Sequence, residues 1–136
     1  MEAVQGDVRD AVRRALAGAE WTRFVAKGAD VSLKVNLGWD LFIPGSITSP
    51  LVLEALIEEI RDHVGRIYVV EADQVLEDIE SAFHASGMAA VCARTGAQWV
   101  NMTDAPTVTE EFSGNVILRR LNADTPAARC RPRCSR

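Results

Sequence analysis

Charged and amide side chains stand at the ends of three segments rich in apolar residues. Lys34 and Asn36 end the first segment, Glu71 and Asp73 follow the second, and Asn101 ends the third. An ammonium beside carboxylates and amides can bind a small anion or transfer a proton, and two carboxylates with an amide suit a hard cation such as Mg²⁺. These chemistries stay open here, as does the alternative that the groups only make the strand ends polar.

The surroundings of Lys34 bear most directly on these alternatives. If both faces of its strand are covered, an unpaired ammonium costs several kcal/mol, so Lys34 needs a ligand or a carboxylate such as Glu71 or Asp73. The alternative is an edge strand with one solvated face, on which Lys34 needs no partner. The alternation of apolar and polar residues in this segment fits both interpretations.

A long irregular segment, residues 38–48, follows the first strand and contains Pro44-Gly45. Loops of this length are uncommon inside compact domains and are often functional. Ser49-Pro50 then predicts a helix start, with a capping hydroxyl and a proline at the first helical position. Unpaired amides and a partial positive charge, worth about 0.3–1 kcal/mol for an exposed charge, make Thr48 and Ser49 candidate anion-binding residues.

Recognised motifs for dinucleotide binding, triphosphate binding and the hydrolase nucleophile elbow are absent from the sequence. His63 and His84 each lack a second histidine at metal-ligand spacing. Cys92 lies in an apolar helical stretch and is predicted to be a buried thiol. Cys130 and Cys134 have no second pair or histidine to complete a zinc tetrahedron, and they support only a redox hypothesis.

The composition excludes several broad classes of protein. A length of 136 residues with 48% hydrophobic and 25% charged residues fits one globular domain. A formal charge of −4 argues against general nucleic-acid binding, and residues 121–136 carry +3, which leaves −7 for the preceding body. No apolar run reaches the roughly 20 residues of a membrane span, and the N-terminus does not resemble a secretory signal, so we expect a cytoplasmic protein.

Helical and strand patterns alternate along the chain. Amphipathic spacing predicts helices over residues 7–17, 49–64, 76–86 and 88–94, and Gly65 is expected to end the second of them in the C′ position. Strands are predicted over residues 30–37, 66–70, 98–102 and 115–121. The pattern predicts an α/β fold with a mainly parallel, three- to four-stranded sheet and flanking helices.

This arrangement predicts where the polar residues gather. Loops converge at the carboxyl ends of parallel strands, so the residues that end the three strands are expected to share one edge of the sheet. We expect a single domain over residues 1–121. Residues 122–136 are rich in Arg, Pro, Cys and Ala without apolar periodicity, which predicts a disordered basic tail.

The features from residue 28 to residue 102 also match the pattern of a known family. They are the strand of residues 28–37, the start Thr48-Ser49-Pro50, Gly65, and the exit Val69-Val70-Glu71-Ala72, with further similarity at Ala82-Phe83, Ser86-Gly87 and Gly96. In this order they resemble the N-terminal half of the domain of unknown function 362 family. Its members show a K-P-N strand end, where this chain has Val35 between Lys34 and Asn36.

The resemblance implies that Lys34 and Asn36 are site residues of an uncharacterised protein, in a family often linked to iron–sulfur proteins. Many members carry ferredoxin-like cysteine clusters; this sequence lacks them, so no iron–sulfur centre is expected and the cofactor is unknown. Members usually continue into a second α/β half. Relative to that full domain the sheet is incomplete, and we expect a truncated or frame-altered product near Ala123-Asp124.

Three hypotheses on function follow. The leading one is a site for a small anionic metabolite or a divalent metal, with Lys34 supplying charge, Asn36 hydrogen bonds, the Ser49 region amides, and Glu71 or Asp73 an acid, base or metal ligand. The second is a non-enzymatic interaction module, or a fragment that needs a partner or its missing half and self-associates through an exposed sheet edge. The third is the redox hypothesis. The sequence assigns no reaction.

Overall fold

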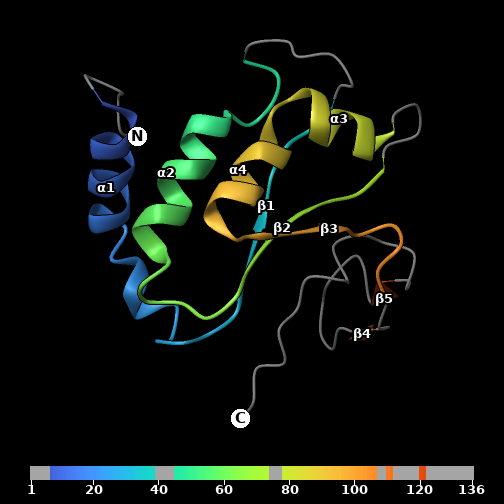
Figure 1. Ribbon diagram of the computed structural model, residues 1–136. Coiled ribbons are helices and arrows are strands. Elements are labelled where there is room, and N and C mark those ends of the chain that lie inside the picture. The colour runs from blue at the N-terminus through green and yellow to red at the C-terminus, as the bar shows by residue number, and fades with distance from the viewer. Residues whose placement is uncertain (1–6, 39–44, 74–77, 107–109, 112–119, 122–136) are drawn as a thin grey trace.

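The computed structural model describes residues 7–38, 45–73, 78–106, 110–111 and 120–121. Its main sheet is parallel and has the strand order β1-β2-β3, with β2 in the centre (Figure 1). The predicted α/β fold with a parallel sheet is therefore confirmed. The elements are α1 (Val8–Gly18), η1 (Trp21–Arg23), β1 (Val31–Lys34), α2 (Pro50–Ile60), β2 (Ile67–Glu71), α3 (Ile79–Ala85), α4 (Met88–Thr95) and β3 (Gln98–Asn101).

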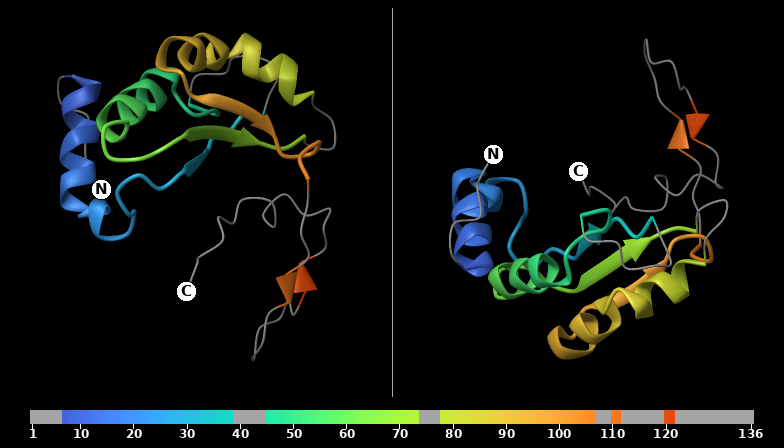
Figure 2. Two further views of the ribbon diagram at one scale, coloured as in Figure 1. Left: turned by 60° about the horizontal axis from the view of Figure 1, so that its bottom comes forward. Right: turned by 90° about the horizontal axis from the view of Figure 1, so that it is seen from above.

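The helices α2, α3 and α4 lie along one face of this sheet (Figure 2). Right-handed crossovers that add each new strand on the same side of the last one must place their connecting helices on one common face. The core between the helices and the sheet consists of close-packed aliphatic and aromatic side chains. Its most buried members are Leu37, Ile57, Val69, Ile79, Met88 and Val91.

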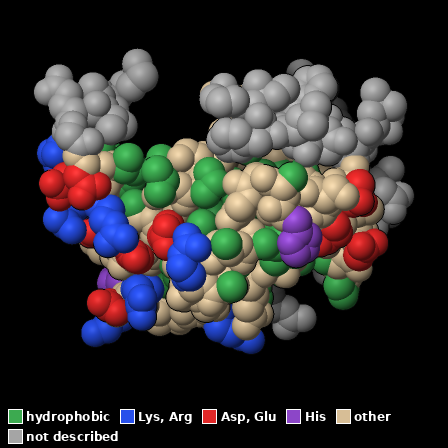
Figure 3. Space-filling model, turned by 45° about the horizontal axis from the view of Figure 1, so that its top comes forward, with side chains coloured by type: hydrophobic (Ala, Val, Ile, Leu, Met, Phe, Trp, Pro, Cys, Tyr) green, Lys and Arg blue, Asp and Glu red, His purple; other side chains and the backbone are tan. Residues whose placement is uncertain are grey.

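Ion pairs fix α1 against α2. Arg9 contacts Glu58 at 2.9 Å and Arg13 contacts Glu59 at 2.7 Å, while Ala11 is the buried residue of α1. The hydrogen bond from the Arg13 guanidinium lowers the pKa of the Glu59 carboxyl. Figure 3 shows basic and acidic side chains interleaved on this side of the molecule. Besides these partly exposed ion pairs, Leu16 of α1 packs against the hydrophobic core.

Gly65 has a different role from the one predicted. The helix α2 ends at Ile60, earlier than the predicted residue 64, and Gly65 is not among the glycines with positive φ. A Cβ atom at Gly65 would lie 2.6 Å from Oδ1 of Asp30 and 2.7 Å from the carbonyl oxygen of Gly28. The position therefore requires glycine because the start of β1 approaches it closely, not because it ends a helix.

The described part of the predicted fourth strand lies in a second sheet. Of residues 115–121, only Arg120–Leu121 are described; they form β5, which pairs antiparallel with β4 (Glu110–Glu111) in a separate two-stranded sheet. Within the described part of the chain the main sheet has three strands, and the predicted tail of residues 122–136 lies outside that part. No described helix is long and apolar enough to cross a membrane.

Candidate functional site

Lys34, the last residue of β1, forms an ion pair with the neighbouring strand. Its Nζ atom donates to Oε2 of Glu71 at 2.8 Å and to the carbonyl oxygen of Val35 at 3.0 Å. The Lys34 side chain is 60% exposed, whereas that of Glu71 is only 5% exposed. In the described sheet β1 is an edge strand. Lys34 thus has both features that the sequence offered as alternatives, a solvated face and a carboxylate partner.

Glu71 ends β2 and is a buried charged residue. Its Oε2 atom accepts from Lys34, and its Oε1 atom accepts from the backbone amide of Ala72 at 3.0 Å. A buried carboxylate is costly unless both of its oxygens are hydrogen-bonded and its charge is paired. Both conditions are met here, so Glu71 is suited to hold the Lys34 ammonium in one position.

Asn36 and Thr48 join the two ends of the loop that follows β1. The backbone amide of Asn36 donates to Oγ1 of Thr48 at 2.9 Å, and the backbone amide of Thr48 donates to the Asn36 carbonyl oxygen at 2.9 Å. The Asn36 side chain also donates to the carbonyl oxygen of Ser46 at 2.9 Å. These bonds bring the amino end of α2 beside the end of β1.

Ser49 occupies the predicted N-cap position of α2, but its side chain makes no capping hydrogen bond. This corrects the prediction of a capping hydroxyl. Pro50 at the first helical position has no amide hydrogen, and the amide of Leu53 is bonded to the Ser49 carbonyl oxygen at 3.0 Å. The exposed Ser49 hydroxyl is therefore not needed by its own helix.

Asp73 is fixed to the end of β3 by two hydrogen bonds. Its backbone amide donates to Oγ1 of Thr103 at 2.9 Å, and Oδ1 accepts from the Asn101 side chain at 3.3 Å. The Asn101 side chain in turn accepts from the Thr103 amide at 2.9 Å. The sequence placed Asn101 and Asp73 at strand ends, but the linking role of Thr103 depends on the register of β2 and β3 and was not predicted.

The contacts of Lys34 with Glu71, of Asn36 with Thr48 and of Asp73 with Asn101 lie at or just beyond the ends of β1, β2 and β3. Adjacent strands of this parallel sheet lie about 4.8 Å apart. The predicted gathering of polar residues at one end of the sheet agrees with this order and with the Lys34–Glu71 and Asn101–Asp73 contacts. In the part of the chain that the structure describes, no three Asp, Glu, His or Cys side chains are placed to share a metal ion.

A family model described as Domain of unknown function (DUF362) matches residues 31–131. The chain belongs to the DUF362 family. The match begins at the first residue of β1 and extends beyond residue 102, where the resemblance in the sequence ended. No curated protein and no solved structure matches the chain. The family description states no function, so roles for residues of this DUF362 protein must come from its geometry.

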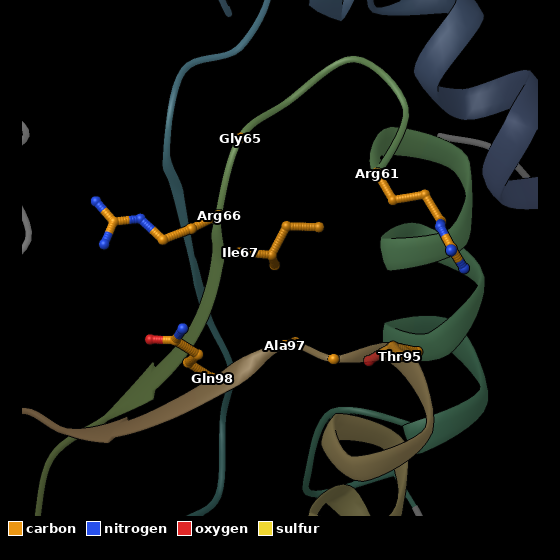
Figure 4. Close-up of a pocket in the computed structure, with 8 residues that line it drawn as sticks. Arg61, Gly65, Arg66, Ile67, Thr95, Ala97 and Gln98 are labelled. Carbon is orange, nitrogen blue, oxygen red and sulfur yellow. The ribbon is translucent and has the colours of Figure 1, made fainter.

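A cavity of about 210 Å³ lies at the opposite end of the sheet of this DUF362 protein, between the turns that enter β2 and β3. Arg61 and Arg66 line it, but Figure 4 shows their side chains pointing away from one another. Arg66 pairs with Asp30 at 2.7 Å, and hydrogen bonds from the Arg66 amide and guanidinium lower the pKa of the Asp30 carboxyl. The two guanidinium groups do not converge on one ligand.

Two further candidate residues of this DUF362 protein, His63 and Cys92, are held by contacts within the fold. The Nε2 atom of His63 lies 2.9 Å from the carbonyl oxygen of Val25, and its ring meets that of Trp21 edge-on at 4.9 Å. Cys92 is buried, as predicted, and burial raises the pKa of its thiol. Cys130 and Cys134 lie outside the described residues.

Proposed function

We propose that this DUF362 protein binds a small anionic ligand at the carboxyl ends of β1, β2 and β3, with Lys34 as the charged contact. The observation that carries the proposal is the position of the Lys34 ammonium, held by Glu71 and by the Val35 carbonyl oxygen while its side chain stays 60% exposed. An ammonium has three donors, and these contacts use two of them. The third is available for a carboxylate or phosphate oxygen.

Glu71 supports this role by fixing the lysine before the ligand arrives. A free lysine side chain loses up to about 2 kcal/mol of conformational entropy when it is ordered. Because the Glu71 ion pair already orders Lys34, a ligand avoids part of this cost. Both oxygens of Glu71 are engaged, so we assign it a positioning role instead of acid–base catalysis.

The segment before α2 supplies further donors. The bonds between Asn36 and Thr48 hold this segment at the end of β1. The Ser49 hydroxyl makes no capping bond, and the first turn of a helix has unpaired amides and a partial positive charge. Ser49 and the amides of the first turn of α2 thus complement Lys34, while Asn36 and Thr48 position them.

Thermal unfolding with a panel of anions tests this proposal. Inorganic phosphate, acetate and malonate are the probes, and any of them present at 100 times its Kd should add about 2.7 kcal/mol of stability. The double variant Lys34→Gln/Glu71→Gln removes both charges of the pair and so leaves no buried carboxylate unpaired. It should lose the stabilisation by anions.

Lys27 provides the matched control, because Lys27 and Lys34 are the only lysines in the sequence. The variant Lys27→Gln removes the other lysine charge, which lies before β1, and should keep the full stabilisation. The proposal is wrong if none of the anions stabilises the native protein, or if the double variant is stabilised as much as Lys27→Gln.

A further inference from the structure

The ends of the three parallel strands carry more negative than positive charge. Lys34 contributes one positive charge, while Glu71, Asp73 and Asp104 contribute three negative charges, so the described strand ends sum to −2. Lys34 and Glu71 neutralise one another through their 2.8 Å contact. A ligand with only negative charge would gain the remaining donor of Lys34 but would be repelled by the other carboxylates.

Asp73 is an exposed carboxylate that is anchored at the end of β3 and keeps unused acceptor capacity. It is exposed, and the hydrogen bond that its side chain accepts, from Asn101, is long at 3.3 Å. A carboxylate has about four acceptor positions on its two oxygens. The backbone of Asp73 is nevertheless held by the 2.9 Å bond of its amide to Thr103. Asp73 therefore presents an anchored carboxylate that can accept from a cationic group.

The positions of Lys34 and Asp73 in the chain set a limit on the length of a ligand that could contact both. Lys34 is the register partner of Val70, and Asp73 lies three residues farther along the chain, two residues past the end of β2. An extended chain rises about 3.3 Å per residue, so the two Cα atoms are offset along the strand direction by at most roughly 10 Å, and the Lys34 side chain reaches forward to the Val35 carbonyl oxygen. Two charge-assisted hydrogen bonds of about 2.8 Å leave room for a few bonded atoms between the two charges of the ligand.

A metal ion fits this charge pattern less well than an organic cation does. In the described ranges no three Asp, Glu, His or Cys side chains could hold a metal together. The Lys34 ammonium also stands against Glu71, where it would repel a cation bound to that carboxylate. A primary ammonium needs only hydrogen-bond acceptors, which Asp73 provides.

From these contacts we infer that the ligand is a small zwitterion, an amino acid in the broad sense, whose carboxylate meets Lys34 and whose ammonium meets Asp73. This inference rests on the proposed function, because it places the anionic group of the ligand at Lys34. It adds a second charged contact and a substrate class, the aminocarboxylates.

Calorimetric titration with three matched compounds tests the inference. The compounds are 4-aminobutyrate, butyrate and butylamine, which share a four-carbon chain and differ in which charges they carry. The zwitterion should bind at least tenfold more tightly than either singly charged compound. The variant Asp73→Asn should remove this preference without weakening the binding of butyrate, and the variant Asp62→Asn, on the exposed turn after α2, should leave the preference unchanged.

The outcomes separate the inference from the function on which it rests. If butyrate or phosphate binds through Lys34 as tightly as 4-aminobutyrate, the zwitterion inference is wrong and the anion site stands. If the preference persists in Asp73→Asn, the assigned ammonium contact is wrong. If neither the three compounds nor phosphate binds at millimolar concentration, the inference and the proposed function both fail.

Discussion

Nζ of Lys34 lies 2.8 Å from Oε2 of Glu71, and the two side chains of this ion pair differ sharply in exposure, at 60% and 5%. The pair joins the edge strand β1 to the central strand β2 at the end where the loops converge. The buried carboxylate fixes an ammonium that solvent can still reach. This asymmetry distinguishes the pair from an ordinary surface ion pair, whose partners are both mobile.

The first prediction concerns the stability of this pair. Lys34→Met should destabilise the protein because it leaves the Glu71 carboxylate buried without its cation. Breaking a fully buried pair costs about 3–5 kcal/mol, and solvent around the exposed lysine should reduce this to about 1–2 kcal/mol. Urea denaturation measures the change, with Lys27→Met as the control. Equal effects of the two substitutions would contradict the role given to Glu71.

The second prediction concerns the close approach at Gly65. Gly65→Ala should cost about 1–3 kcal/mol, because the new Cβ would lie 2.6 Å from Asp30 and 2.7 Å from the Gly28 backbone. Gly18→Ala is the control, since a Cβ there meets nothing within 4 Å at the end of α1. Chemical denaturation of both variants measures the free energy of unfolding. An unchanged free energy of unfolding in Gly65→Ala would show that the approach is not tight.

A third prediction follows from the pKa of Asp30, which the hydrogen bonds from the Arg66 amide and guanidinium lower. A depressed folded-state pKa contributes stability that is present above the unfolded value, about 3.9, and is lost as the pH falls through the folded value. Asp30→Asn should therefore weaken the loss of stability below about pH 4. Urea midpoints measured across this acidic range test the prediction, and an unchanged pH profile would contradict it.

The bond between Asn36 and Thr48 leads to the fourth prediction. Thr48→Val removes the acceptor of the Asn36 amide and should cost about 0.5–1.5 kcal/mol. Hydrogen exchange at the Asn36 amide should speed up in this variant. Thr48→Ser keeps the hydroxyl and should exchange like the native protein; fast exchange in Thr48→Ser as well would mean that the hydroxyl does not protect this amide.

Several features of the site could be predicted because they depend on local pattern. The apolar runs located β1, β2 and β3, and the direction of parallel strands then grouped Lys34 with Glu71. Features that depend on register or on close approach could not be predicted in this way. The missing cap of Ser49, the bond of Thr103 to Asp73 and the steric need for Gly65 all involve contacts that one-dimensional periodicity does not specify.

The antiparallel pairing of β5 shows the same limit. The apolar run near Leu121 indicates a strand, but it does not identify the partner strand. In the structure the partner is Glu110–Glu111, a short acidic segment with no strand signal in the sequence. Partner choice is a tertiary property, so the sequence pattern predicts a strand here without specifying the sheet to which it belongs.

The most direct measurement observes the two lysine ammonium groups by nuclear magnetic resonance in protein labelled with ¹⁵N-lysine. With only Lys27 and Lys34 in the chain, the two Nζ signals can be assigned from the Lys27→Gln variant. During titration with phosphate or 4-aminobutyrate, the Lys34 signal should shift and saturate while the Lys27 signal stays in place. A Lys34 signal that does not move, or that moves only in parallel with Lys27, would contradict a ligand site at the end of β1.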